Sequence, residues 1–384
     1  MRLFNVFIKS MREQLRSYWM LLLTVSIAPV FVLVYWFITG GGTTTYKIMV
    51  INNDQPSVSS ASEQIIENIR QLSYADGQPI LKVIMSDDRA QAESGLKNRE
   101  AAALIIFPQD FSSTLESAKE TGSQASTRLT MVGDLTYPYY PLVSIMAYTA
   151  VDDFVKQELG QVSPVVLDEV ALGASSARTE FEMYVPALLI LAVVMMIFQV
   201  AMTVAREVEG GTLKRLQMTN MTSFDLLGGI SLTQVLIGVI AVIITFLTAS
   251  LLGFRSQGPL WVAILVGTLT SFSIIGVGLI IACIARTVSE AFIYSNFPLV
   301  LLMFFTGAVF PIPVIPLFTI GSRTIGLFDG LPPTHAVVAL NKVLTLGAGF
   351  KDILYEVTAL TVLSLLYFVI GVWLFQKTRL HKTT

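Results

Sequence analysis

Charged residues are scarce in this chain of 384 residues. Asp, Glu, Lys and Arg make up 14% of it, whereas hydrophobic residues make up 53% and the mean hydropathy is +0.68. Since soluble domains carry about 25% charged residues, this composition excludes an ordinary soluble protein and indicates a membrane protein. The net charge is −2 and no long basic run occurs, so we expect no nucleic-acid partner.

The chain also lacks the motifs of enzymes and of self-sufficient pumps. No G-x-x-x-x-G-K-[ST] phosphate loop, H-E-x-x-H motif or C-x-x-C motif occurs. The single cysteine, Cys283, is expected to be a small core residue, and His335 and His381 to be surface or interface residues. We therefore expect no catalytic residue, no bound metal, no cofactor and no ATP hydrolysis by this chain itself.

Six apolar runs without a charged residue are long enough to cross a bilayer, because a hydrocarbon core of roughly 30 Å requires about 20 helical residues. They are residues 18–38, 184–204, 230–252, 260–284, 291–310 and 357–375. Residues 1–17 mix apolar and basic side chains at helical spacing, which is typical of an interfacial amphipathic helix. We interpret residues 18–38 as an uncleaved signal anchor.

The orientation follows from Lys and Arg in the short segments between runs, since these residues resist translocation. With the N-terminus inside, the inner segments hold Arg2, Lys9, Arg12, Arg16, Arg206, Lys214, Arg215, Arg286, Lys377, Arg379 and Lys382. The short outer segments hold only Arg255, Arg323, Lys342 and Lys351. Both termini, including the tail 376–384, and the segment 205–228 are therefore predicted to be cytoplasmic, and residues 39–183 extracytoplasmic.

The outer region 39–183 shows strand and helix patterns in alternation. Strands are predicted at 46–52, 80–85, 101–107 and 127–134, and helices at 59–72, 88–99 and 139–160. The expected fold is therefore an α-helical polytopic membrane protein with six transmembrane helices and an inserted extracytoplasmic α/β domain. Its membrane region covers residues 184–375.

The segment 205–228 is the most polar part of the apolar two thirds. Glu207 and Glu209 follow an apolar run, and Gly210-Gly211 is expected to end the helix before Thr212 caps a short second helix. Such a helix, with an apolar side at Leu213 and Leu216, is able to dock in a partner's cleft. The residues alone leave a solvated charged loop equally open.

Three further patterns lead to specific predictions. Thr222-x-x-Asp225 and Thr287-x-x-Glu290 predict capping boxes at the starts of two spans. The segments PIPVIPLFTI and HAVVALNKVLTL, within 311–352, predict re-entrant or interfacial helices. Polar residues inside the spans more often bond helices together than line a path, and the candidates for a substrate pathway are Gln199, Thr203 and Asn296.

Two stretches resemble type-2 ABC exporter permeases, in the subset with a large extracytoplasmic domain after the first span. EVEGGTLKRLQMTNMTSFDLLGGI resembles the family segment E-x-x-x-G-T-L-x-x-L-x-x-T-P-x-x-x-x-E-x-x-x-G-K after the second span. FTGAVFPIPVIPLFTI followed by LPPTHAVVALNKVL is similar to the family's closing pattern. The chain departs from these patterns at Thr219-Asn220, at Gly229, where the family has Lys, and at Asn341-Lys342.

The resemblance implies a permease subunit for efflux of drugs or other amphipathic compounds across a bacterial plasma (inner) membrane. Its implied partners are a separate ATP-binding cassette ATPase subunit, a second permease chain, identical or paralogous, and membrane lipid. Residues 1–17 correspond to the family's elbow helix. The residues implied to couple to the ATPase are Glu207, Glu209, Gly211, Thr212, Leu213, Arg215 and Leu216.

Two other functions are compatible with the sequence. One is a non-transporting membrane receptor or scaffold whose outer domain binds a ligand. The other is a secondary drug antiporter, although no Asp or Glu occurs inside a span, and ion-coupled transporters commonly use such a carboxylate.

Overall fold

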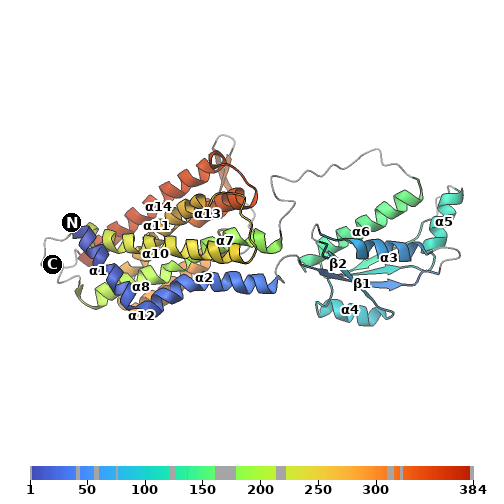
Figure 1. Cartoon of the computed structure of the whole chain (residues 1–384), viewed down its shortest axis with the longest axis horizontal. Helices are drawn as coiled ribbons and strands as arrows, with labels where there is room; N and C mark the ends of the chain where they lie inside the picture. The colour runs from blue at the N-terminus through green and yellow to red at the C-terminus, as the bar shows by residue number, and fades with distance from the viewer. Residues whose placement is uncertain are drawn as a thin grey trace. The chain divides into compact units, whose positions relative to one another are not determined.

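The computed structural model describes residues 2–39, 44–55, 60–74, 77–121, 126–135, 137–160, 179–212, 222–308, 315–320 and 323–380. The chain forms two compact units, shown in Figure 1. The helical unit comprises Met1–Gly42 with Ala171–Thr384, and the smaller unit comprises Thr43–Val170. This division matches the predicted insertion of one domain after the first span.

The helical unit contains an N-terminal helix, a set of apolar helices, and shorter elements between the last two of them. The helices are α1 (Arg2–Arg16), α2 (Tyr18–Ile38), α7 (Glu180–Val194), α8 (Met196–Glu209), α10 (Ser223–Leu251), α11 (Leu260–Ile284), α12 (Val288–Phe304) and α14 (Leu354–Phe375). Within the described residues, five helical segments are long and apolar enough to cross a membrane, α7 and α8 counting as one, and α12 is shorter. The predicted multi-pass helical fold is confirmed.

The second predicted span, 184–204, is longer in the structure because local signals extend it at both ends. A capping box of Thr179 and Glu182 starts α7, and the helix interrupts at Met195 before it continues as α8 to Glu209. The fifth predicted run is shorter as a helix, since α12 ends at Phe304 with 17 residues.

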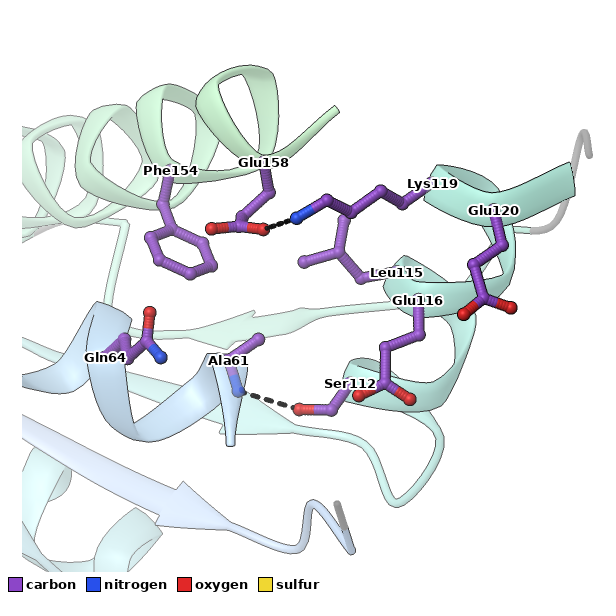
Figure 2. Close-up of a pocket in the computed structure, with 9 residues that line it drawn as sticks. All are labelled: Ala61, Gln64, Ser112, Leu115, Glu116, Lys119, Glu120, Phe154 and Glu158. Atoms are coloured by element: carbon purple, nitrogen blue, oxygen red, sulfur yellow. Dashed lines mark hydrogen bonds and ion pairs between the residues drawn. The ribbon is translucent and has the colours of Figure 1, made fainter. Parts of the chain in front are cut away.

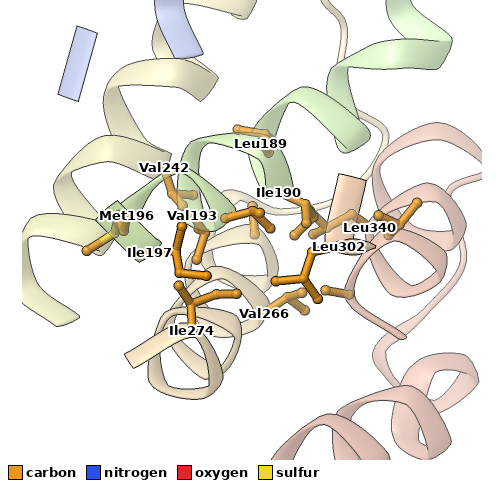
Figure 3. Close-up of a cluster of buried hydrophobic side chains, with 14 of the residues drawn as sticks. Leu189, Ile190, Val193, Met196, Ile197, Val242, Val266, Ile274, Leu302 and Leu340 are labelled. Atoms are coloured by element: carbon orange, nitrogen blue, oxygen red, sulfur yellow. The ribbon is translucent and has the colours of Figure 1, made fainter. Parts of the chain in front are cut away.

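The core of the helical unit surrounds α11, and Figure 3 shows its central cluster of aliphatic side chains. Three glycines let neighbouring helices approach α11 closely. A Cβ atom on Gly267 would lie 2.8 Å from Val242 of α10, one on Gly276 2.6 Å from the Tyr367 backbone of α14, and one on Gly278 2.6 Å from Val200 of α8. The absence of a side chain at these three positions therefore permits close helix contact on three sides of α11.

Large apolar side chains cover the outer surface of the same unit. Examples on four helices are Leu23, Leu247, Phe297 and Val362, which are between 50% and 73% exposed. Such a surface would be unfavourable in water but suits hydrocarbon chains, so it is the lipid-facing side of a multi-pass membrane protein.

The smaller unit is a mixed α/β sheet domain. Its elements are β1 (Tyr46–Asn52), α3 (Ala61–Gln71), β2 (Leu81–Met85), α4 (Arg89–Lys97), β3 (Ala103–Phe107), α5 (Phe111–Thr121), β4 (Thr130–Val132) and α6 (Tyr139–Glu158). The strand order is β2-β1-β3-β4, in which β1 is parallel to β2 and β3 while β4 is antiparallel to β3. Helices α3, α5 and α6 cover one face of the sheet and α4 covers the other (Figure 1).

This arrangement follows from the sequence of crossovers. The chain moves from β1 to β2 through α3 and then back past β1 to β3 through α4, so right-handed connections place the two helices on opposite faces. The central strand β1 is therefore buried on both faces, with Ile48 and Val50 against one helical layer and Met49 and Ile51 against the other.

Helix α5 was not predicted from the sequence, and tertiary contacts hold it. Ser112 donates its hydroxyl to Asp54 at 2.5 Å and accepts the Ala61 amide at 2.9 Å, while Lys119 pairs with Glu158 at 2.7 Å. Figure 2 shows the resulting cavity of about 390 Å³ between α3, α5 and α6. Its wall contains both carboxylates and apolar groups.

The segment between α12 and α14 differs in part from the prediction. The elements are β5 (Pro316–Ile320), β6 (Arg323–Gly326), the 3₁₀ turn η2 (Leu327–Gly330), α13 (Pro332–Leu340), the π turn η3 (Asn341–Thr345) and the 3₁₀ turn η4 (Phe350–Ile353), and a further π turn, η5 (Gln376–Leu380), follows α14. The helix predicted for PIPVIPLFTI is wrong over 316–320, which pairs as a hairpin with β6. Prolines disfavour helix before them, and Leu-Phe-Thr-Ile favours strand.

The second predicted helix of that segment is present as α13 with η3. Its histidine is buried rather than on the surface: His335 is 5% exposed, and its Nε2 lies 2.9 Å from the Asp329 carbonyl oxygen. Lys342 forms an ion pair with the buried Glu356 at 2.7 Å, which ties η3 to α14. At Asn341-Lys342, where the chain departs from the family pattern, a cation is therefore still present as Lys342, and it has a structural partner in Glu356.

Candidate functional site

The predicted break after Glu209 is present at the C-terminal end of α8. The Gly210 amide donates to the Arg206 carbonyl at 2.9 Å, and Gly211 has a φ of +66°, a conformation that favours glycine. Thr212 follows and is partly exposed. Leu213, Arg215 and Leu216 lie outside the described residues, so their predicted helix and coupling role stay predictions.

Glu207 joins the end of α8 to the N-terminal helix. Its Oε1 lies 2.9 Å from Lys9 Nζ, and Lys9 also lies 3.4 Å from Glu13 on its own helix. Partial burial by itself lowers the pKa of Lys9, but the hydrogen bond and charge of Glu207, with a further contribution from Glu13, outweigh it and raise this pKa. The α1 helix is thus electrostatically attached to α8.

Glu209 joins the same end to α12. Its Oε2 accepts the backbone amide of Val288 at 2.9 Å, which is the first residue of that helix. Thr287 caps α12 as predicted, but the Glu290 carboxylate accepts the Arg286 amide rather than that of Thr287, so the reciprocal half of this predicted box is wrong. The carboxylate reaches one residue further back along the chain.

Helix α10 starts beside α1. Thr222 and Asp225 form the complete predicted capping box, with amide contacts of 3.0 and 3.2 Å. Next in α10, Gly228 and Gly229 give α1 its docking surface, because a Cβ atom on Gly229 would lie 2.6 Å from Val6 Cβ. The Lys that the resembling family carries at this position would not fit under α1 in its present place.

These contacts gather at one end of the helical unit, which we call the α1 end: α1, the end of α8, and the starts of α10 and α12. The terminal turn after α14 also reaches it, because Arg379 donates to the carbonyls of Ala282 and Ala285 at the end of α11. The predicted coupling residues Glu207 and Glu209 therefore lie at the α1 end, where they contact α1 and α12.

An apolar cavity of about 330 Å³ lies between α2, the α7–α8 junction and α12. Three methionines and two phenylalanines supply much of its wall, and Phe198 and Phe292 pack ring against ring with centroids 5.1 Å apart. The two polar side chains of the wall are Thr24 and Gln199. The lining residues are Met20, Leu23, Thr24, Ile27, Met195, Phe198, Gln199, Met202, Phe292 and Leu299.

The three predicted pathway residues occupy different environments. Gln199 is 3% exposed, lines the cavity and donates its amide to Gln14 at 2.5 Å. Thr203 lies one turn further along α8 and accepts hydrogen bonds from Gln14 and Gln234. Asn296 is exposed on α12 and donates to carbonyls of its own helix.

Gln14 and Gln234 were not selected from the sequence. The signal was present at Gln14, since it shares helical spacing with Leu3, Phe7 and Ser10 and so lies on a side of α1 that faces protein. A buried glutamine on such a side requires a partner, which the sequence does not identify.

The comparisons with known proteins concern nearly the whole chain. A family model described as "ABC-2 family transporter protein" matches residues 17–373, which covers the whole of the smaller unit, most of the helical unit, five of the predicted spans in full and residues 357–373 of the sixth. No curated protein matches the chain.

Proposed function

The chain belongs to the ABC-2 transporter family, and from this premise we propose that it is the permease subunit of an ATP-driven exporter of drugs or other amphipathic compounds. Family members are typically non-catalytic membrane subunits that pair with ATPase subunits. The proposal adds a second permease chain, identical or related, so that the substrate pathway forms within a pair.

The observation that carries the proposal is the double attachment at the end of α8. Glu207 binds Lys9 of α1 and Glu209 binds the first amide of α12, immediately before the Gly210-Gly211 break. A force applied to segment 205–228 would therefore act on α1, α8 and α12 together. Two of these helices, α8 and α12, border the cavity.

The proposed orientation places the α1 end in the cytoplasm of a bacterium and the smaller unit outside its plasma membrane. The excess of Lys and Arg in the segments at the α1 end supports it. In this orientation the segment 205–228, with Thr212, Leu213, Arg215 and Leu216, faces the ATPase.

The cavity supports an amphipathic substrate. Its wall is apolar except for Thr24 and Gln199, and it contains no charged side chain among the described residues. Methionine side chains adapt to differently shaped ligands. We propose that Gln199 contacts the substrate, and that Thr203 and Asn296 lie along its route in the assembled pair.

The coupling assignment is tested by transport in proteoliposomes that contain the chain and the ATPase that co-purifies with it. Arg215→Glu and Gly211→Trp are expected to uncouple ATP hydrolysis from uptake of rhodamine 6G while the chain stays folded. Lys351→Glu is a matched control, because Lys351 is an exposed cation in η4, the turn that precedes α14, away from the α1 end. Unchanged transport in both test variants would remove the coupling assignment.

The same preparation separates the exporter from the other two functions. Absence of any co-purifying ATPase would favour a receptor or scaffold. Transport that persists after ATP depletion, with the proton gradient intact, would identify a secondary antiporter.

A further inference from the structure

A chain of hydrogen-bonded side chains leads from the cavity to the N-terminal helix. Thr24 lies 3.3 Å from Gln199 Oε1, Gln199 Nε2 donates to Gln14 Oε1 at 2.5 Å, and Gln14 Nε2 donates to Thr203 at 3.2 Å. Gln234 also donates to Thr203, at 3.4 Å. These five residues come from α2, α8, α1 and α10, so one polar chain joins four helices.

At the cavity, the hydrogen bond between Thr24 and Gln199 is weak enough for a ligand to replace it. The Thr24 hydroxyl has one proton, and it lies closer to the Met20 carbonyl, at 2.8 Å, than to Gln199 Oε1. The Gln199 oxygen is therefore weakly satisfied although the residue is 3% exposed and belongs to the cavity wall. A hydrogen-bond donor inside the cavity would find an acceptor there.

The docking of α1 is incompletely satisfied as well. Within the described residues, Ser10 Oγ, Ser231 Oγ and Gln234 Oε1 are buried and have no hydrogen-bond partner. All three belong to α1 or α10, which pack against each other. Since unpaired buried polar groups destabilise the packing that buries them, this interface is easier to open than an apolar one.

We propose that the Gln199–Gln14 contact reports occupancy of the cavity to α1, and that the ligands sensed have an apolar body with one hydrogen-bond donor. This inference rests on the proposed function of the cavity as part of the export pathway. A donor from the ligand binds Gln199 Oε1 and turns the amide, so that Gln199 Nε2 leaves Gln14. Helix α1 then loosens, and its Lys9–Glu207 pair passes the change to the end of α8.

The inference is tested on the full chain in nanodiscs, with an occupant fixed in the cavity. Cys283→Ala removes the natural thiol, and Met202→Cys places a single new thiol in the cavity wall. The thiol is labelled either with N-(2-hydroxyethyl)maleimide, whose hydroxyl is a neutral group with one donor, or with N-propylmaleimide, which has nearly the same shape without one. Hydrogen exchange of the α1 amides is then measured.

We expect the hydroxyethyl label to speed α1 exchange about fivefold, the factor for losing one net hydrogen bond, and the propyl label to change it by less than about twofold. With Gln14→Leu added, exchange is already fast and neither label changes it. Ser10→Ala is the matched control. It removes a buried polar group one turn earlier on α1 that takes no part in the hydrogen-bonded chain of side chains, so this variant should respond to the labels like the parent protein.

Equal effects of the two labels, no effect of either, or a response that survives Gln14→Leu would each overturn the inference. The measurement requires no ATPase. A failure of ATP-driven transport with the α1 response intact would therefore remove the exporter proposal, whereas normal transport without the α1 response would remove only the role of Gln14.

Discussion

We predict that Gly229→Ala weakens the docking of α1 on α10 more than any other substitution that adds a single methyl group at this contact. In Gly229→Ala the new Cβ would lie 2.6 Å from Val6 Cβ, 2.7 Å from Val6 Cγ1 and 2.9 Å from the Leu3 carbonyl oxygen. All three atoms belong to the backbone or to the β-branched side chain of Val6, so no flexible side-chain end can move aside. The whole of α1 must shift away from α10.

The size of the effect follows from the balance of two terms. Overpacking of this kind destabilises by about 1–3 kcal/mol, and the better helix propensity of Ala returns about 1 kcal/mol. The propensity gain stabilises α10, whereas the overpacking acts on the contact with α1. The equilibrium constant for opening of α1 should therefore increase by the factor that corresponds to the overpacking term alone, about 5- to 150-fold.

Limited trypsin digestion of the chain in nanodiscs measures this opening, because Arg12 and Arg16 lie on the exposed side of α1. When opening and closing are fast, the cleavage rate follows the population of the open state. Gly228→Ala is a close control, since its nearest neighbour is the movable Leu3 Cδ1 at 2.9 Å, and Gly330→Ala meets nothing within 4 Å.

We expect less than about a threefold change for Gly228→Ala and none for Gly330→Ala, since only backbone or branched neighbours resist a new methyl group. A Gly229→Ala chain that is cleaved at the parent rate would refute the reasoning, because α1 would then not depend on close contact at this position.

Three further predictions concern the α1 end. Glu209→Ala should speed hydrogen exchange at the start of α12 about three- to tenfold, since it removes the acceptor of the Val288 amide; unchanged exchange would contradict this. Lys9→Met should weaken α1 docking by at most about 1 kcal/mol, because Lys9 is 46% exposed. Since the contact with Glu207 raises the pKa of Lys9, the contribution of the Lys9–Glu207 pair to α1 docking should be constant near neutral pH and be lost only as pH rises above about 10.4. A loss between about pH 6 and about pH 8 would contradict this prediction. Gly211→Val should lower ATP-driven transport through a backbone strain of about 1–2 kcal/mol, and Gly211→Asn should largely retain it, because Asn tolerates positive φ; equal transport by both variants would exclude strain as the cause.

Elements whose sequence pattern is periodic were predicted well. The strand predicted at 46–52 is β1 without a change of bounds, and the helix predicted at 139–160 is α6 over 139–158. Helix α5 was missed because its sequence, FSSTLESAKET, has few apolar residues. Its position depends on the hydrogen bonds between Ser112 and Asp54, which are 58 residues apart.

The helix expected for PIPVIPLFTI, which is a strand over 316–320, shows a different failure. An apolar run of this length fits a strand or a buried helix equally well, and periodicity does not separate them. The proline content and the pairing with β6 decide for the strand.

The sequence by itself determined that this is a multi-pass membrane protein, where its apolar helices lie, that a domain is inserted after the first, and that a glycine break ends α8. These features depend on composition, run length and residues a few positions apart. Only the tertiary structure decided that Gln14 reaches Gln199, that Glu209 holds the amide of Val288, and that Gly229 lies under Val6. The two hydrogen-bonded pairs are separated by 185 and 79 residues, and a polar side chain in an apolar helix shows that it requires a partner without showing which helix supplies it.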